Sequence, residues 1–194
     1  MELKSYQKEA LRTLRDFLTK AAATGPAAAF ADAVAAQDAL ARLEGREAPP
    51  RTYRPLEAML DVPYVCLRLP TGGGKTILAA EAIGIAVDYM RTPRPLTLWM
   101  VPSDTIKTQT LEALKNTRHP YRQRLDAVFG GRVRVFDIAE FETLRPQDLA
   151  RFTCVVVATI QAFRVENTAG RKVYAHHEEL EPHFSALPTE GMET

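Results

Sequence analysis

Apolar residues recur at helical spacing near the start of the chain, and this spacing predicts two helices in succession. In the segment from Ser5 to Lys20, one apolar face is formed by Tyr6, Ala10, Leu11, Leu14, Phe17 and Leu18. Gly25 and Pro26 interrupt that pattern, and an alanine-rich helix is predicted from about residue 27 to residue 43. Residues 1–60 are therefore expected to form an N-terminal helical segment that ends in a proline-rich loop.

Beyond this segment, apolar runs alternate with helical patterns, which is typical of a parallel sheet covered by helices. Strands are predicted at residues 62–69, 96–101, 132–137 and 152–158, and the first of them is expected to be buried. Helices are predicted at residues 77–90, 103–116 and 121–129, with a short helical turn at 146–150. The fold class is therefore expected to be α/β, with a parallel-sheet core at residues 61–163.

Two details of burial follow from the same pattern. The run at 152–158 is β-branched almost throughout, so it is expected to be buried on both faces, whereas 132–137 is expected nearer a sheet edge. In the helix at 103–116, the residues expected to face inward are Ile106, Leu111 and Leu114. Residues 164–194 are polar and are expected to be weakly structured, with a weak helix at 175–187.

A glycine-rich loop joins the first predicted strand to the following helix. Its sequence, residues 70–76, is Pro70, Thr71, Gly72, Gly73, Gly74, Lys75 and Thr76. A strand, a glycine-rich turn and a helix in that order form the context in which backbone amides surround phosphate oxygens. Lys75 is expected to reach the terminal phosphates, and the Thr76 hydroxyl is expected to bind Mg²⁺. The usual pattern has glycine five residues before Gly74, where this chain has Leu69.

Composition narrows the functional classes. The net charge is +1 over 194 residues, so any contact with nucleic acid must come from local groups and not from a basic field. Cys66 and Cys154 lie in apolar runs and are expected to be buried thiols of a reducing, cytoplasmic compartment. No run is long and apolar enough to span a bilayer.

The cluster of His176, His177 and His183 fits no zinc spacing and predicts a solvated helix face.

Three further motifs, together with the loop, carry a resemblance to a known family. They are Leu3–Leu11 (LKSYQKEAL), Val101–Thr110 (VPSDTIKTQT) and Val155–Phe163 (VVVATIQAF). In this order, the set resembles the first RecA-like domain of superfamily two helicases, the DEAD/DEAH-box proteins. It is most similar to the type III restriction enzyme motor subunits and the UvrB-type helicase N-terminal domain. The resemblance covers nearly the whole chain, and a loop without the first glycine is usual in that family.

The resemblance implies roles for individual residues. Gln7 would read the edge of adenine, and residues 70–76 would hold ATP with Mg²⁺. The backbone of one nucleic-acid strand would be contacted by Ser103, Thr105, Gln109, Thr159 and Gln161. Hydroxyls and amides at strand ends suit phosphate contacts that read no bases. The alternatives are a solvated helix residue for Gln7, and simple capping or turn formation for Ser103 and Thr159.

Hydrolysis of ATP needs acidic residues that this sequence lacks. In the family, an adjacent Asp-Glu pair after an apolar strand holds Mg²⁺ and orients water, and no Asp-Glu pair occurs in the 194 residues. The resemblance therefore implies an incomplete RecA-like domain, the N-terminal portion of a motor. We expect it to bind ATP but not to hydrolyse it or to unwind a duplex. Without the acidic-box strand, we also expect an exposed sheet edge.

The resemblance also implies binding partners, and two other functions compete with the motor. The implied partner is DNA, with RNA as the alternative, together with the remainder of the motor and a methyltransferase subunit. One competing interpretation is a phosphotransferase of small acceptors, for which the candidate lid residues are Arg164, Arg171 and Lys172. The other is a non-catalytic module gated by nucleotide.

Overall fold

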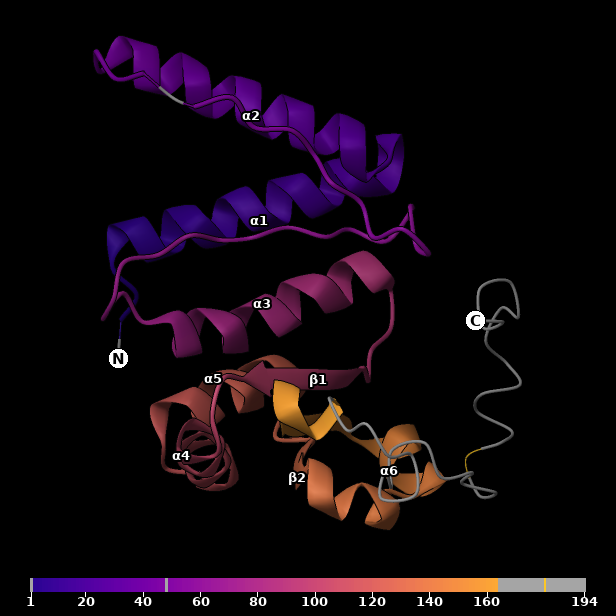
Figure 1. Ribbon diagram of the computed structural model, residues 1–194. Coiled ribbons are helices and arrows are strands. Elements are labelled where there is room, and N and C mark those ends of the chain that lie inside the picture. Colours follow the sequence, from indigo (N-terminus) through magenta and orange to yellow (C-terminus); the bar gives the residue numbers. More distant parts are fainter. Residues whose placement is uncertain (1, 48, 164–179, 181–194) are drawn as a thin grey trace. The chain divides into compact units, whose positions relative to one another are not determined.

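The computed structural model describes residues 2–47, 49–163 and Leu180 (Figure 1). These residues form two compact units, one up to Leu78 and the other from Ala79 onward. The weak helix expected at 175–187, apart from Leu180, and the polar segment expected at 164–194 lie outside the described residues. The same is true of the candidate phosphotransferase residues and of the histidine cluster.

The first unit begins with a helical hairpin, as predicted. Helix α1 covers Ser5–Thr24 and helix α2 covers Pro26–Leu43, and Gly25 alone joins them. Gly25 has a φ of 84°, a conformation that side chains rarely adopt, and Pro26 starts α2 where no amide donor is needed. Along α1, the buried apolar residues are Leu11, Leu14, Phe17, Leu18 and Ala21. The helical period that predicted α1 is therefore confirmed by its buried face, except at Tyr6, which was expected on that face and is exposed.

The segment at residues 62–69 differs from the prediction. It was expected to be a buried strand, but no residue of it belongs to a ladder within the described part of the chain. Burial alternates along it, with Val65 and Leu67 half-buried and Val62 and Tyr64 exposed. Cys66 was expected to be buried, but it is exposed, because it lies at an exposed position of this alternation. An extended conformation with an apolar side was therefore predicted correctly, and its pairing was not.

The second unit contains a parallel three-stranded sheet. Its strands are β1 (Leu96–Val101), β2 (Val133–Asp137) and β3 (Thr153–Thr159), in the order β1-β3-β2. Every residue of β3 is buried, and β2 lies at an edge, as the sequence predicted. The register places Val101 beside Thr159 and Asp137 beside Val157, so all three strands end close together.

Helices connect the strands and cover the sheet. They are α3 (Lys75–Met90), which begins in the first unit and continues in the second, α4 (Asp104–Lys115), α5 (Pro120–Phe129) and α6 (Pro146–Arg151), with 3-10 helices η1 (Ile138–Thr143) and η2 (Ile160–Phe163). The helices predicted between residues 77 and 150 are confirmed within two residues at either end, whereas α1 extends four residues beyond its predicted end at Lys20. Ile106, expected to face inward, is exposed, because the buried stripe of α4 runs through Thr110, Ala113 and Leu114.

The central strand contributes to cores on both faces of the sheet. Val155 and Val157 pack in one cluster with residues of α3, α4 and α5, among them Ile83, Leu114 and Leu125. Cys154 and Val156 point to the other face, where they pack with Phe136 and Leu144. This alternation is what a parallel strand covered on both faces requires. The second unit is thus an α/β layer structure consistent with part of a RecA-like domain.

One edge of this sheet remains open, as expected. Among the described residues, β1 pairs only with β3, and its residues Leu96, Leu98 and Met100 are exposed. A groove of about 520 Å³ lies between the edge of β1 and the apolar side chains of α3, including Ile83 and Val87. The unpaired backbone groups and the apolar groove together mark β1 as an unprotected edge.

Candidate nucleotide-binding site

The glycine-rich loop folds tightly against itself before α3 begins. Gly72 and Gly74 have φ values of 74° and 76°, in the region that favours glycine. The amide of Gly73 donates to the carbonyl of Pro70 at 3.0 Å, and a Cβ on Gly73 would lie 2.8 Å from that oxygen. All three glycines are therefore required by the backbone path, which fits a loop whose amides must approach a ligand closely.

Backbone donors are left free where this loop enters the helix. The first helical hydrogen bond of α3 runs from the amide of Leu78 to the carbonyl of Gly74, at 3.1 Å. Among the described residues, the amides of Gly74, Lys75 and Thr76 have no protein acceptor. Unpaired amides at the start of a sixteen-residue helix, with the positive end of its dipole, favour an anion. Phosphate oxygens fit this donor set.

Lys75 adds a cation beside these amides. Its Nζ donates to the carbonyl of Pro70 at 3.0 Å, and its side chain is exposed. Within the described chain, no carboxylate oxygen lies within 4.0 Å of this Nζ. Moving the ammonium to a phosphate would therefore break one exposed hydrogen bond and no ion pair. Thr76 follows directly and is half-buried, so its hydroxyl lies on the same turn as these donors.

Gln7 lies against this loop, and it is 3% exposed. Its Nε2 donates to the carbonyl of Gly73 at 2.9 Å, and its Oε1 accepts from the amide of Lys4 at 2.8 Å. The Tyr6 hydroxyl donates to the same Gly73 carbonyl at 3.2 Å. The alternative of a solvated helix residue is therefore wrong for Gln7. The contact from Tyr6 could not be predicted from the sequence, because it depends on how α1 packs.

The five residues expected to contact nucleic acid all belong to the second unit. The register of Val101 with Thr159 sets the ends of β1 and β3 side by side. Ser103, Thr105 and Gln109 follow β1, and Gln161 follows β3 in η2. The structure therefore brings the two motifs to the carboxyl edge of one parallel sheet, where ligands of open α/β sheets commonly bind.

Exposure and capping differ among these five residues. Ser103 caps α4, because its Oγ accepts from the amide of Ile106 at 3.4 Å, so the capping alternative holds for it. Ser103, Thr105, Gln109 and Gln161 are exposed, whereas Thr159 is 4% exposed. Four of the five are thus accessible to a partner, and Thr159 is held in the sheet.

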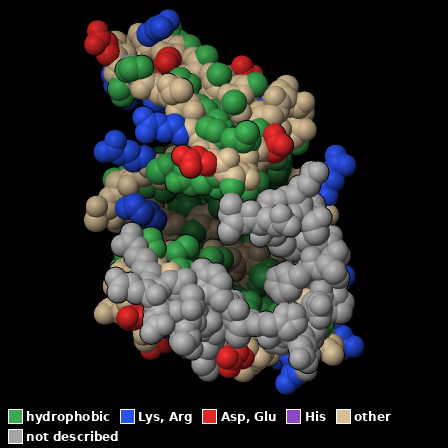
Figure 2. Space-filling view, turned by 45° about the vertical axis from the view of Figure 1, so that its right-hand side comes forward, with side chains coloured by type: hydrophobic (Ala, Val, Ile, Leu, Met, Phe, Trp, Pro, Cys, Tyr) green, Lys and Arg blue, Asp and Glu red, His purple; other side chains and the backbone are tan. Residues whose placement is uncertain are grey.

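A lysine at this edge was not singled out from the sequence. The Nζ of Lys107 lies 3.2 Å from Asp137 at the end of β2 and 3.6 Å from Asp104. The two carboxylates balance this cation, so the edge carries no net excess of positive charge from it. Charges of both signs also mix with apolar side chains elsewhere, as the top of Figure 2 shows where α2 lies.

A comparison with protein families decides the relationship. The family model described as "Type III restriction enzyme, res subunit" matches residues 1–186 of the 194. The chain belongs to this family. The resemblance seen in the loop and its neighbouring motifs is thereby confirmed, and so is the α/β fold class that it implied. No curated protein and no solved structure matches the chain significantly.

Membership of the res subunit family indicates an ATP-dependent, helicase-type motor domain. It implies use of a nucleotide with Mg²⁺ and interaction with nucleic acid, which agrees with the donors at the start of α3. Of the helices that the structure describes, none has the length and apolar content to cross a membrane.

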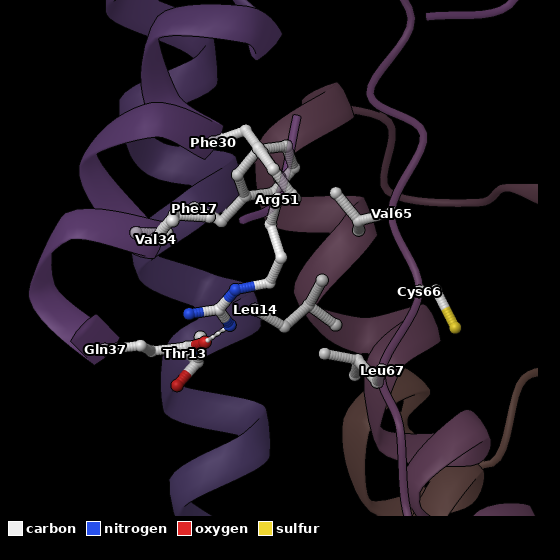
Figure 3. Close-up of a pocket in the computed structure, with 11 residues that line it drawn as sticks. Thr13, Leu14, Phe17, Phe30, Val34, Gln37, Arg51, Val65, Cys66 and Leu67 are labelled. Atoms are coloured by element: carbon white, nitrogen blue, oxygen red, sulfur yellow. Dashed lines mark hydrogen bonds between the residues drawn. The ribbon is translucent and has the colours of Figure 1, made fainter. Parts of the chain in front are cut away.

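A separate cavity of about 150 Å³ lies in the first unit and does not suit a nucleotide (Figure 3). Phe17 and Phe30 line it from the two helices, and Val65 and Leu67 line it from the extended segment. The guanidinium of Arg51 bonds to Gln37 and Asp38 beside it. Its volume is about half of the lower limit of about 300 Å³ for ligand pockets, and its lining is mostly apolar. It is therefore best explained as imperfect packing.

Proposed function

We propose that this chain is the ATP-binding N-terminal part of a nucleic-acid-dependent motor, a DNA translocase of the type III restriction enzyme type. The observation that carries the proposal is the set of free amides at Gly74, Lys75 and Thr76, with the Lys75 ammonium beside them. Membership of the res subunit family supports the reaction class, because its members are helicase-type motors.

In this proposal, the chain holds the triphosphate mainly through its backbone. The amides at the start of α3 donate to phosphate oxygens, and Lys75 leaves the Pro70 carbonyl for the terminal phosphates. The Thr76 hydroxyl oxygen would be a ligand of Mg²⁺, and the ion would screen the negative charge of the phosphates. The glycines keep side chains out of the space that the phosphates would fill.

The nucleic-acid contacts are proposed for the carboxyl edge of the sheet. Ser103, Thr105 and Gln109 after β1, with Gln161 after β3, would hold the sugar-phosphate backbone of one strand. Thr159 is the last residue of β3 and is buried, so no direct contact is proposed for it. Polar, uncharged groups suit a strand that must slide without being read. DNA is the proposed partner and RNA is the alternative. The remainder of the motor, a methyltransferase subunit and a cytoplasmic location stay predictions.

We expect this 194-residue chain to bind ATP without hydrolysing it. No adjacent Asp-Glu pair is present to hold Mg²⁺ and orient water. Phosphate release measured with ATP, Mg²⁺ and single-stranded DNA should stay at the background of the buffer. Release that Lys75→Ala abolishes would show that this expectation is wrong.

Calorimetric titration with ATP and Mg²⁺ tests the binding itself. Lys75→Ala should weaken ATP binding by about 10- to 100-fold, which is the usual contribution of a charge-assisted hydrogen bond to affinity. Lys20→Ala is the matched control, because Lys20 lies in the same unit and pairs with Asp32 on the surface. Absence of any ATP binding, or equal loss in the two variants, would contradict the proposed function.

A further inference from the structure

One carbonyl of the phosphate loop accepts hydrogen bonds from two side chains of a distant helix. The Gly73 oxygen receives the Gln7 Nε2 at 2.9 Å and the Tyr6 hydroxyl at 3.2 Å. All of these groups belong to the first unit. Two donors on one oxygen leave it little freedom to rotate, because rotation would break both bonds.

The side chain of Gln7 is itself held from both ends. Its Oε1 accepts from the amide of Lys4 at 2.8 Å, which directs the Nε2 toward the loop. A Cβ built on Gly74 would lie 2.4 Å from that Nε2, so glutamine and loop backbone are in direct contact. With 3% of its surface exposed, Gln7 is a buried polar residue whose donor is used by the loop.

The geometry of a peptide group links this contact to phosphate binding. The peptide joining Gly73 to Gly74 is trans and planar, so its C=O and N–H point in opposite directions. Holding the Gly73 carbonyl toward α1 therefore turns the Gly74 N–H away from α1. That N–H is among the amides at the start of α3 that have no acceptor in the described part of the protein. The orientation of a proposed phosphate donor is thus fixed by Tyr6 and Gln7.

We infer that Tyr6 and Gln7 are positioning residues that hold the phosphate loop in its binding conformation, whatever base the nucleotide carries. The inference rests on the proposed function, since it assumes that the loop binds a triphosphate. It differs from the adenine-reading role that the family resemblance implies for Gln7. A residue that reads adenine affects only adenine nucleotides, whereas a residue that positions the loop affects every triphosphate.

The test compares three probes in calorimetric titrations with Mg²⁺: ATP, GTP and inorganic tripolyphosphate, which has no base. Tyr6→Phe should weaken the binding of all three by the same factor, about 3- to 10-fold, since one neutral hydrogen bond is lost. Gln7→Glu keeps the size and the acceptor for Lys4 but removes the donor, and a loss of about 10-fold or more is expected for each probe. Tyr6→Phe keeps the test valid if Gln7→Glu does not fold.

Tyr53→Phe is the control, because its hydroxyl also donates to a backbone carbonyl of the first unit, that of Val62, at 3.3 Å, and in addition accepts from the amide of Tyr64 at 3.1 Å. It should leave all three affinities unchanged, while the melting temperatures of the two ligand-free Phe variants should be similar. Loss of ATP binding alone, or unchanged affinities in both Tyr6→Phe and Gln7→Glu, would overturn the inference. So would a loss in Tyr53→Phe equal to that in Tyr6→Phe. A wild-type chain that binds none of the three probes would defeat the proposed function, and the inference with it.

Discussion

Two apolar segments of similar length, β3 and residues 62–69, have different structures. Residues of β3 pair on both sides, so Val155 has Thr97 and Val135 as neighbours, and the whole strand is buried. The segment at 62–69 is extended, has no ladder within the described residues, and exposes every second side chain. Both had been predicted to be buried strands from their apolar content.

The difference shows that apolar content predicts an extended segment, whereas partners decide whether it is a strand. β3 is β-branched at most positions and carries no proline. The other segment contains Pro63, which cannot donate to a ladder, and Arg68, whose charge requires solvent or a partner. Burial of β3 should therefore contribute far more to stability than burial in residues 62–69.

The largest expected effect comes from the same substitution in the two segments. Val157→Asp places a carboxylate in the fully buried core of the second unit and should destabilise that unit by about 4 kcal/mol or more. Val62→Asp, at an exposed position, should change stability by less than about 0.5 kcal/mol. Trp99 in β1 is the only tryptophan, so its fluorescence in a denaturant titration reports on the second unit. Circular dichroism at 222 nm in the same titration includes the helices α1 and α2 of the first unit, to which Val62 belongs.

The two variants act as controls for each other, because they introduce the same charge. A Val62→Asp variant that loses as much stability as Val157→Asp would mean that residues 62–69 are paired and buried in solution. The contrast between the segments would then be wrong. Similar, small losses in both variants would mean that the sheet core is not packed as described.

Two arginines make a second, smaller contrast between the units. Arg122 in α5 donates to Asp126 at 2.8 Å and to the carbonyls of Leu114 and Val133 at 3.1 Å and 3.0 Å, and its side chain is 11% exposed. It thereby ties α4, α5 and β2 together. Arg51 in the first unit bonds to two side chains of α2 and is 34% exposed.

Arg122→Ala should therefore destabilise the second unit by about 2–4 kcal/mol, because it leaves two buried carbonyls with fewer donors. Arg51→Ala should lower the stability of its own unit by less than about 1 kcal/mol, as is usual for partly exposed ion pairs. Trp99 fluorescence measures the first effect, and helical circular dichroism at 222 nm includes the second. A smaller loss for Arg122→Ala than for Arg51→Ala would contradict the arrangement of α5 against β2.

These contrasts also explain how far the sequence could predict the structure. Local signals sufficed for the elements: β1 has the predicted bounds, Gly25 separates α1 from α2, and Ser103 caps α4. They also located the glycine-rich loop of the candidate site, because its glycines and Lys75 are contiguous. Non-local contacts could not be predicted. The bonds from Tyr6 and Gln7 to the loop join segments far apart in sequence, and no periodicity encodes them.

The two cysteines allow β3 and residues 62–69 to be compared through single side chains, because one cysteine lies in each segment. Burial raises the pKa of the Cys154 thiol in β3 from 9.0 to about 11, and the nearby carboxylate of Asp148 acts in the same direction. Its thiolate is therefore about 100-fold scarcer near pH 8 than that of an ordinary cysteine. Cys66 is exposed in the extended segment. Titration with a thiol reagent at pH 8 should therefore modify one thiol per native chain.

In Cys66→Ser, modification should be absent until denaturant is added, and in Cys154→Ser it should proceed as in the unchanged chain. Rapid modification of native Cys66→Ser would show that β3 is accessible. Two thiols reacting slowly and equally would instead indicate that residues 62–69 are buried.

The smallest expected effect is a pH dependence that belongs to the second unit. Glu140 in η1 accepts from the amide of Asp137 at 3.0 Å and from Lys115 Nζ at 3.0 Å, and these bonds, the backbone bond first, lower its pKa from 4.5. A carboxyl whose pKa is lowered in the folded state stabilises the fold above its unfolded pKa, and loses that contribution as pH falls through the folded value. Because its side chain is 49% exposed, solvent screening limits the contribution to less than about 1 kcal/mol. The free energy of unfolding, followed by Trp99 fluorescence, should therefore decline less steeply below about pH 4.5 in Glu140→Gln than in the unchanged chain. An identical decline in both would show that this carboxyl is solvated in the folded protein.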